Sequence, residues 1–238
     1  MLASCNTPVN PIVIGHRGAR GHVAENTLPS IKKALELGVD AVEIDIFKCA
    51  SGELVVFHDV LLDKLTNSTG YIESLDLDSI QKIKVLDGFK IPTLAEVLNL
   101  IEGKILLNIE LKGTQTAVLT HELLQSYFEA GSWSENKIII SSFNWQELAL
   151  FYEVNQVVPI AILTEADPLD AIPIGKQLNA QAINPHYRAL NKENVKKIKS
   201  ENFKIYPWTV NAAEDINNMI SLGVDGIITD FPERVPKK

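Results

Sequence analysis

Cysteine and basic residues are scarce in this sequence. Only two of 238 residues are cysteine, Cys5 and Cys49. They are too few for a disulfide framework and lie in no paired metal-ligand spacing, so we expect a reduced, cytoplasmic protein. Lys and Arg number 22 against 30 Asp and Glu, a formal net charge of −8. Nucleic acids and anionic membranes bind proteins through clustered basic residues, so we expect neither as a partner. A small-molecule ligand agrees better with this composition.

Long apolar runs are also missing. The longest candidates, such as Lys104–Leu111, are shorter than about ten residues and contain polar groups, whereas a bilayer-spanning helix needs about 20. The start, Met1–Cys5, looks superficially like a lipoprotein cleavage box but lacks the basic and apolar stretch of a leader, so we expect no membrane anchor. The 46% hydrophobic content excludes a disordered chain and provides a sizeable core.

Short β-branched runs alternate with longer segments of helical periodicity, which predicts βα units along the chain. The predicted strands are Ile12–Gly15, Ala41–Phe47, Lys104–Leu111, Lys137–Ser142, Val158–Leu163, Gln181–Asn184, Phe203–Trp208 and Gly226–Thr229. The predicted helices are Leu28–Leu37, Leu94–Ile101, Thr116–Ala130, Trp145–Val154, Leu169–Leu178, Lys192–Ser200 and Ala213–Leu222. Eight units in 238 residues approach the roughly 250 residues of a (β/α)₈ TIM barrel, which we predict, with a doubly wound open sheet as the alternative.

One segment interrupts this rhythm. Residues from about 51 to 94 contain a short strand candidate, Leu54–Phe57, and then a polar, turn-rich stretch. Ordinary connections have about two to six residues, so this one is predicted to be a small insertion after the second strand. No linker or low-complexity segment separates it, and we expect a single domain over residues 9–236.

Histidines end two of the apolar runs. The first strand leads into Gly15-His16-Arg17-Gly18, where glycines allow close backbone approach and the Arg17 fork matches phosphate oxygens. The short extra strand leads into Phe57-His58-Asp59. Each histidine taken alone is more simply a structural residue, but two of them would serve as general acid and base.

Paired carboxylates lie on two neighbouring strands. Glu43 and Asp45 alternate with apolar residues and therefore share one face of their strand. Glu110 lies on the same strand face as Lys112 and Asn108. Three inward carboxylates would form an all-oxygen site for Mg²⁺, Ca²⁺ or Mn²⁺, unless one strand face is solvated. Lys112 is either a counter-ion of Glu110 or a phosphate contact.

These residues belong to a series that resembles the glycerophosphodiester phosphodiesterase family, in family order from about Gly15 to Asp230. The matching motifs are His16-Arg17-Gly18, Glu25-Asn26-Thr27, Val42-Glu43-Ile44-Asp45, Phe57-His58-Asp59, Ile91-Pro92-Thr93-Leu94, Asn108-Ile109-Glu110-Leu111-Lys112 and Trp208-Thr209-Val210-Asn211. Departures, such as Ala24 in place of the usual proline and Lys64 in place of arginine, lie in turns and the insertion. They spare every expected ligand.

The resemblance implies a TIM barrel with a small insertion after the second strand, and a set of roles. By similarity to the family, His16 and His58 are the acid and base. The resemblance implies that one divalent metal is held by Glu43, Asp45 and Glu110. It also implies that Arg17 binds phosphate with Lys112 near it, and that Glu25 and Trp208 line the pocket. Asn26 and Thr27 are expected to cap the following helix. His22, His121 and Phe143 are read as surface or packing residues, and His186 is left open.

The expected reaction is metal-dependent hydrolysis of glycerophosphodiesters, such as glycerophosphocholine or glycerophosphoethanolamine, to glycerol 3-phosphate and an alcohol. The resemblance allows either direct attack by water or attack by the glycerol hydroxyl through a cyclic phosphate. Lysophospholipase D activity is one alternative. A barrel lyase or aldolase with Lys112 as Schiff-base nucleophile is another, and a non-catalytic phosphate-binding protein is a minor third. Head-group preference, native metal and oligomeric state are left open.

Overall fold

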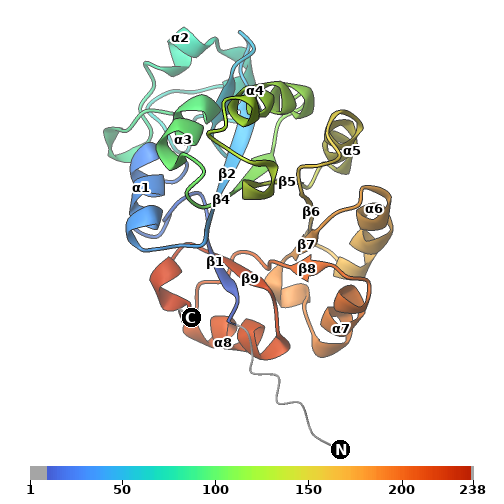
Figure 1. Ribbon diagram of the computed structural model, residues 1–238. Coiled ribbons are helices and arrows are strands. Elements are labelled where there is room, and N and C mark those ends of the chain that lie inside the picture. The colour runs from blue at the N-terminus through green and yellow to red at the C-terminus, as the bar shows by residue number, and fades with distance from the viewer. Residues whose placement is uncertain (1–9, 237–238) are drawn as a thin grey trace, which may run out of the picture.

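The computed structural model describes residues 10–236, so Cys5 and residue 9, where the single domain was expected to begin, lie outside the described residues. Figure 1 shows the strands at the centre with helices around them. The strands are β1 (Ile12–Gly15), β2 (Ala41–Lys48), β3 (Leu54–Val56), β4 (Leu106–Leu111), β5 (Ile138–Ser142), β6 (Ile160–Thr164), β7 (Ala182–Pro185), β8 (Lys204–Ile205) and β9 (Gly226–Thr229).

All of these strands except β3 form a parallel barrel. Their order within the described residues is β8-β7-β6-β5-β4-β2-β1-β9, and every neighbouring pair along it is parallel. Backbone hydrogen bonds complete the ring, because Asp225 N–H donates to Ile205 and Ile228 N–H donates to Pro207. The predicted (β/α)₈ barrel is confirmed, and the open sheet is excluded.

Helices follow the strands and cover the outside of the barrel. They are α1 (Leu28–Glu36), α3 (Leu94–Ile101), α4 (Ala117–Glu129), α5 (Trp145–Val154), α6 (Ala171–Gln177), α7 (Lys192–Ser200) and α8 (Ala213–Leu222), whereas the short α2 (Leu77–Ile80) lies in the insertion. Thr27 caps α1 and Thr93 caps α3, each by accepting a backbone N–H. Gly223 ends α8 in the left-handed conformation, φ 77°.

The core has an outer and an inner part because side chains alternate along each strand. Outward residues such as Ile44, Ile109 and Ile140 pack beneath the helices in the larger cluster. Inward residues such as Ile14, Ile139 and Tyr206 form a smaller cluster inside the barrel. Polar inward residues follow at the carboxyl ends of the strands. The barrel interior is therefore apolar toward the amino ends of the strands and polar at its mouth, which is the carboxyl end.

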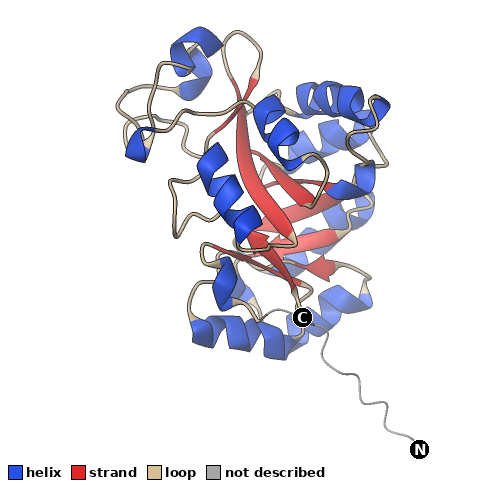
Figure 2. Ribbon diagram, turned by 60° about the vertical axis from the view of Figure 1, so that its left-hand side comes forward, coloured by secondary structure: helices blue, strands red, loops and turns tan. Residues whose placement is uncertain are grey.

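The insertion lies beside the carboxyl end of β2 (Figures 1 and 2). Its strand β3 pairs antiparallel with β2, with Phe47 opposite Val55. A separate cluster that includes Phe57, Leu62 and Ile72 packs beneath the polar surface. The insertion after the second strand is therefore built as a packed extension of the barrel rim.

Several predicted boundaries differ from the structure by one to three residues, and two of these differences have a local cause. The β8 ladder covers only Lys204–Ile205, not residues 203–208, because Pro207 has no N–H to donate. Helix α6 begins at Ala171 because Pro168 opens a separate short 3-10 turn before it. Among residues 10–236, no helix is both long and apolar enough to cross a membrane.

Candidate active site

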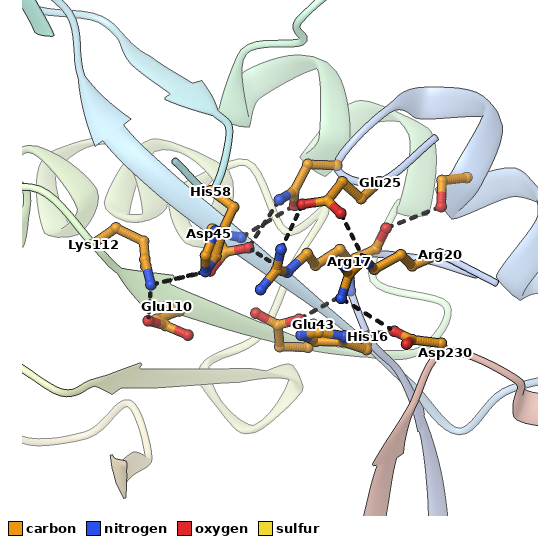
Figure 3. A network of polar contacts seen from close by, with 12 residues as sticks. His16, Arg17, Arg20, Glu25, Glu43, Asp45, His58, Glu110, Lys112 and Asp230 are labelled. Atoms are coloured by element: carbon orange, nitrogen blue, oxygen red, sulfur yellow. Dashed lines mark hydrogen bonds and ion pairs between the residues drawn. The ribbon is translucent and has the colours of Figure 1, made fainter. Parts of the chain in front are cut away.

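A cavity of about 140 Å³ opens at the carboxyl ends of the barrel strands. Most residues that were singled out in the sequence meet there (Figure 3). The lining residues are His16, Arg17, Arg20, Glu43, His58, Asn108, Glu110, Lys112, Phe143, Leu163, Trp208, Thr209 and Ile228. The position agrees with the face on which TIM barrels carry their active sites.

Three carboxylates converge at the bottom of this mouth. Strand β2 supplies Glu43 and Asp45, and β4 supplies Glu110, which is the register partner of Asp45. One oxygen from each lies within 4.8 Å of the others, and all three residues are buried. Burial and the neighbouring carboxylates raise the pKa of Glu43 well above its usual value and that of Glu110 to about 7.

The carboxylate cluster fits a hard divalent cation. Its donors are all oxygens, and buried like charges are stable together only when a cation joins them. Among the described residues, Glu43 Oε1 and the inward Asn108 Oδ1 are buried without a hydrogen-bond partner. Since buried acceptors are normally paired, an ion with oxygen ligands would satisfy this cluster.

Two cationic side chains flank the carboxylates. Arg17 Nη1 lies 2.5 Å from Glu25 and its Nε lies 3.2 Å from Asp45. On the other side, Lys112 Nζ lies 3.1 Å from Glu110. Burial opposes ionisation of Asp45, but Arg17, His58 and Lys112 together lower its pKa. Basic side chains thus flank the carboxylate cluster, which suits an anionic ligand above a metal.

The two histidines are both held through Nδ1. His16 Nδ1 lies 2.7 Å from Asp230, and its Nε2 lies 4.0 Å from Glu43. His58 Nδ1 lies 2.6 Å from Asp59, and its Nε2 accepts a 3.2 Å hydrogen bond from Lys112. Burial is the main cause that lowers both imidazole pKa values. Burial thus favours the neutral form of both rings, and a ring that acts as a general acid must first take up a proton at Nε2.

An aromatic wall closes one side of the cavity. Trp208 and Phe143 meet edge to face, with ring centroids 5.2 Å apart. The indole N–H of Trp208 donates to the Asn184 carbonyl at 2.8 Å, which fixes the ring. His186 also meets Trp208 edge to face, with ring centroids 5.2 Å apart, and is not a lining residue of the cavity.

The sequence model of the Glycerophosphoryl diester phosphodiesterase family matches residues 16–234, which include every residue of this cavity. The chain belongs to this family. It is 35% identical over 232 residues to the glycerophosphodiester phosphodiesterase of Caldanaerobacter subterraneus subsp. tengcongensis, covering 93% of this chain and 95% of that protein. Identity to the glycerophosphodiester phosphodiesterase of Bacillus altitudinis is 31%, with coverage of 94% and 96%.

Solved structures show the same fold. The structure of an Oleispira antarctica phosphodiesterase in complex with the product sn-glycerol-3-phosphate is similar with a TM-score of 0.88 and 26% identity. The similarity covers 95% of each chain. The resemblance to the glycerophosphodiester phosphodiesterases that the motifs indicated is therefore confirmed across the barrel.

Within this family member, most residues predicted for the site meet at one cavity. Asp45 is fully buried beneath the residues that line the cavity. Glu25, which was expected to line the pocket, is not among its lining residues. Glu25 lines an adjacent groove and is paired with Arg17 and with Arg20, at 2.6 Å from the latter. Its visible effect is to hold the two guanidinium groups beside the cavity.

One expectation about the loop before α1 is wrong. Thr27 caps the helix as predicted, but Asn26 does not. The Asn26 amide donates to Asp45 Oδ2 at 2.8 Å and accepts from the Asp45 backbone N–H at 3.2 Å. A positive φ of 57° turns Asn26 toward the strand. Asn tolerates this conformation better than most residues.

Sequence reasoning missed Asp230, Arg20 and the cavity position of Phe143. Asp230 directly follows β9, so the same rule that selected His16 would have selected it. Phe143 also directly follows a strand, β5, but was read as packing. Arg20 is in a loop, and no periodicity in the sequence places it near Glu25.

Proposed function

We propose that this protein hydrolyses glycerophosphodiesters, such as glycerophosphocholine and glycerophosphoethanolamine, to glycerol 3-phosphate and an alcohol, with a divalent metal. The observation that carries the proposal is the buried cluster of Glu43, Asp45 and Glu110 between His16 and His58 at one cavity. Family membership and the glycerol phosphate in the Oleispira structure support the substrate class. We also propose residues 9–236 as one catalytic domain, with residues about 51–94 as its insertion.

Glu43, Asp45 and Glu110 are the proposed metal ligands. When bound, a divalent cation, Mg²⁺ or Ca²⁺ with Mn²⁺ as a further choice, offsets the negative charge that repels nucleophiles from a phosphodiester. Arg17, whose guanidinium is held by Glu25, binds the phosphate oxygens, and Lys112 lies near them. Trp208 and Phe143 exclude water from one side of the cavity.

His16 and His58 are the proposed general acid and base. One histidine takes the proton of the attacking hydroxyl as the new P–O bond forms, and the other gives a proton to the alcohol as its P–O bond breaks. The attacking oxygen belongs either to water or to the glycerol of the substrate, and the second route forms a cyclic phosphate. Phosphorus NMR of the reaction mixture distinguishes the two routes by the signal of the cyclic ester.

The lyase or aldolase alternative is disfavoured by the state of Lys112. A Schiff-base lysine needs a neutral amine. Burial opposes the ammonium form, but Glu110 and Asp45 overcome it and raise the Lys112 pKa above its usual value. Lys112 is therefore an ammonium group beside carboxylates, which suits charge compensation.

Lysophospholipase D activity remains a second candidate because of an apolar groove next to the cavity. Ala24, Phe57, Leu65, Val85 and Leu86 line about 220 Å³ of space, and Arg20 borders both spaces. An acyl chain would find apolar surface there. The expected cytoplasmic location and the absence of a nucleic-acid partner stay predictions.

A substrate panel tests the proposal. The protein is stripped with a chelator, given Mg²⁺, Ca²⁺ or Mn²⁺ in turn, and assayed with glycerophosphocholine, glycerophosphoethanolamine and lysophosphatidylcholine. We expect glycerol 3-phosphate from the first two substrates. Release of lysophosphatidic acid alone would favour the second candidate, and no hydrolysis of any of the three would contradict the substrate class.

A further inference from the structure

Asp230 contacts His16 from the end of the last barrel strand. Its Oδ1 lies 2.7 Å from His16 Nδ1, although the two residues are 214 positions apart (Figure 3). The backbone supports the same approach, because His16 N–H donates to the Thr229 carbonyl at 2.9 Å. The contact therefore joins the first and last strands of the barrel directly at the mouth of the cavity.

The Asp230 carboxylate is itself held in place by Asn211. The Asn211 amide donates to Asp230 Oδ2 at 2.8 Å, and Asn211 Oδ1 accepts the Asp230 backbone N–H at 2.9 Å. Thr229 Oγ1 donates to the same Asn211 oxygen at 3.1 Å. Asn211 ends the Trp208–Asn211 motif, and unlike Trp208 it is not among the residues that line the cavity. Arg20 is the other charged neighbour, with Nη1 3.9 Å from Asp230 Oδ1.

We propose that Asp230, fixed by Asn211, is a positioning residue that sets the tautomer and the orientation of His16. A carboxylate can only accept, so the neutral imidazole gives its one N–H, at Nδ1, to Asp230. The other nitrogen, Nε2, is then without a proton and turned toward Glu43 and the cavity. This inference rests on the proposed function, because it gives His16 the bare nitrogen that proton transfer requires.

The substitution Asp230→Asn tests the assignment with little change in shape. An amide can donate to Nδ1 as well as accept from it, so the tautomer of His16 is no longer fixed. We expect kcat to fall by about 10²- to 10⁴-fold, as when an amide replaces the carboxylate behind a catalytic histidine, while KM changes little. Nitrogen NMR of labelled histidine should show the Nδ1–H form in the parent protein and a gain of the Nε2–H form in the variant.

Asp225→Asn is the matched control at the opposite end of β9. Asp225 accepts the Ile205 N–H at 2.9 Å and pairs with Lys199 at 3.2 Å. Replacing its carboxylate therefore affects the stability of the fold but no residue of the cavity. We expect the control to keep kcat and the His16 tautomer. In a His16→Ala background, Asp230→Asn should cause no further loss of kcat.

A parent-like kcat in Asp230→Asn, or an Nε2–H tautomer in the parent protein, would overturn the proposal. The tautomer measurement needs no substrate, so it also separates this inference from the proposed function. A protein that hydrolyses no phosphodiester but shows the Nδ1–H form would refute the function and keep the His16–Asp230 assignment.

Discussion

His16 and His58 differ in their surroundings although a carboxylate holds Nδ1 of each. His16 is 8% exposed and lies inside the barrel between Asp230 and Glu43. His58 lies at the edge of the insertion, more exposed, with Lys112 donating to its Nε2. Because their positions around the carboxylate cluster differ, the two rings are suited to act on different oxygens of one phosphodiester.

Replacement of either histidine by alanine should abolish most of the activity. We expect His16→Ala and His58→Ala each to lose at least about 100-fold in kcat on glycerophosphocholine, the usual contribution of general acid or base catalysis. His22→Ala is the control, since His22 pairs with Glu233 on the surface at 3.0 Å. Parent-like turnover in either site variant would remove that histidine from the mechanism.

A substrate with an activated leaving group should separate the two roles. Departing p-nitrophenolate needs no proton, so the variant that lacks the general acid should recover much of its loss on a p-nitrophenyl phosphodiester, whereas the variant that lacks the base should not. Equal losses on both substrates in both variants would contradict the acid–base pair.

Side chains on strands were the predictable part of the site. Alternation alone places Glu43 with Asp45, and the register between β2 and β4 then brings Glu110 beside them. Alternation does not select Asp230 or Asn26, although the end of the last strand marks Asp230 as a residue of the mouth. Their contacts with His16 and Asp45 depend on how loops close after distant strands, which leaves no local periodicity in the sequence.

At the scale of elements, the motif Ile91–Leu94 has a structural explanation. Thr93 accepts the Glu96 backbone N–H at 3.2 Å, and the Glu96 carboxylate accepts the Thr93 backbone N–H at 2.8 Å. This reciprocal capping box begins α3 directly after the insertion. The motif therefore marks the return of the chain from the insertion to the barrel.

Removal of this cap should cost stability and leave catalysis unchanged. We expect Thr93→Ala to lower the free energy of unfolding by about 1 kcal/mol, the usual cost of a lost N-cap, in urea titrations. Thr93→Ser is the matched control and should keep most of the cap. An alanine variant as stable as the parent, or one with altered kcat at low urea, would contradict this role.

Strands and helices were mostly predictable because the hydrophobic periodicity and the turn and capping residues indicate the same boundaries along the chain. The turns of the insertion were not, since Leu61 and Tyr71 pair across a loop with no apolar alternation. The short β8 has a simple cause in Pro207, which a closer reading of the sequence would have found. Local rules thus predict the barrel better than its rim.

At the scale of the whole molecule, the net charge of −8 does not describe the cavity. Arg17, Arg20 and Lys112 gather at the mouth, above carboxylates that a divalent cation would neutralise. The expectation from this net charge, that polyanions are not partners, stays a prediction. The cavity itself is suited to one small anion.

The buried carboxylates should couple stability to pH. The pKa of Glu110 is raised to about 7 in the fold, so between about pH 4.5 and 7 the folded chain keeps a proton that the unfolded chain loses. This group therefore lowers stability as pH rises through that window. In chelator, Glu110→Gln should gain stability relative to the parent from about pH 5 to about pH 7.5, as measured by urea unfolding. A difference independent of pH would contradict the assignment.

The central claim is a metal-dependent phosphodiesterase built on Glu43, Asp45 and Glu110. Its most direct test measures glycerol 3-phosphate released from glycerophosphocholine by chelator-stripped protein before and after Mg²⁺, Ca²⁺ or Mn²⁺ is added, with Glu43→Gln alongside. We predict that release depends on the added metal and falls at least about 100-fold in the variant. Full activity without metal, or in Glu43→Gln, would contradict the account.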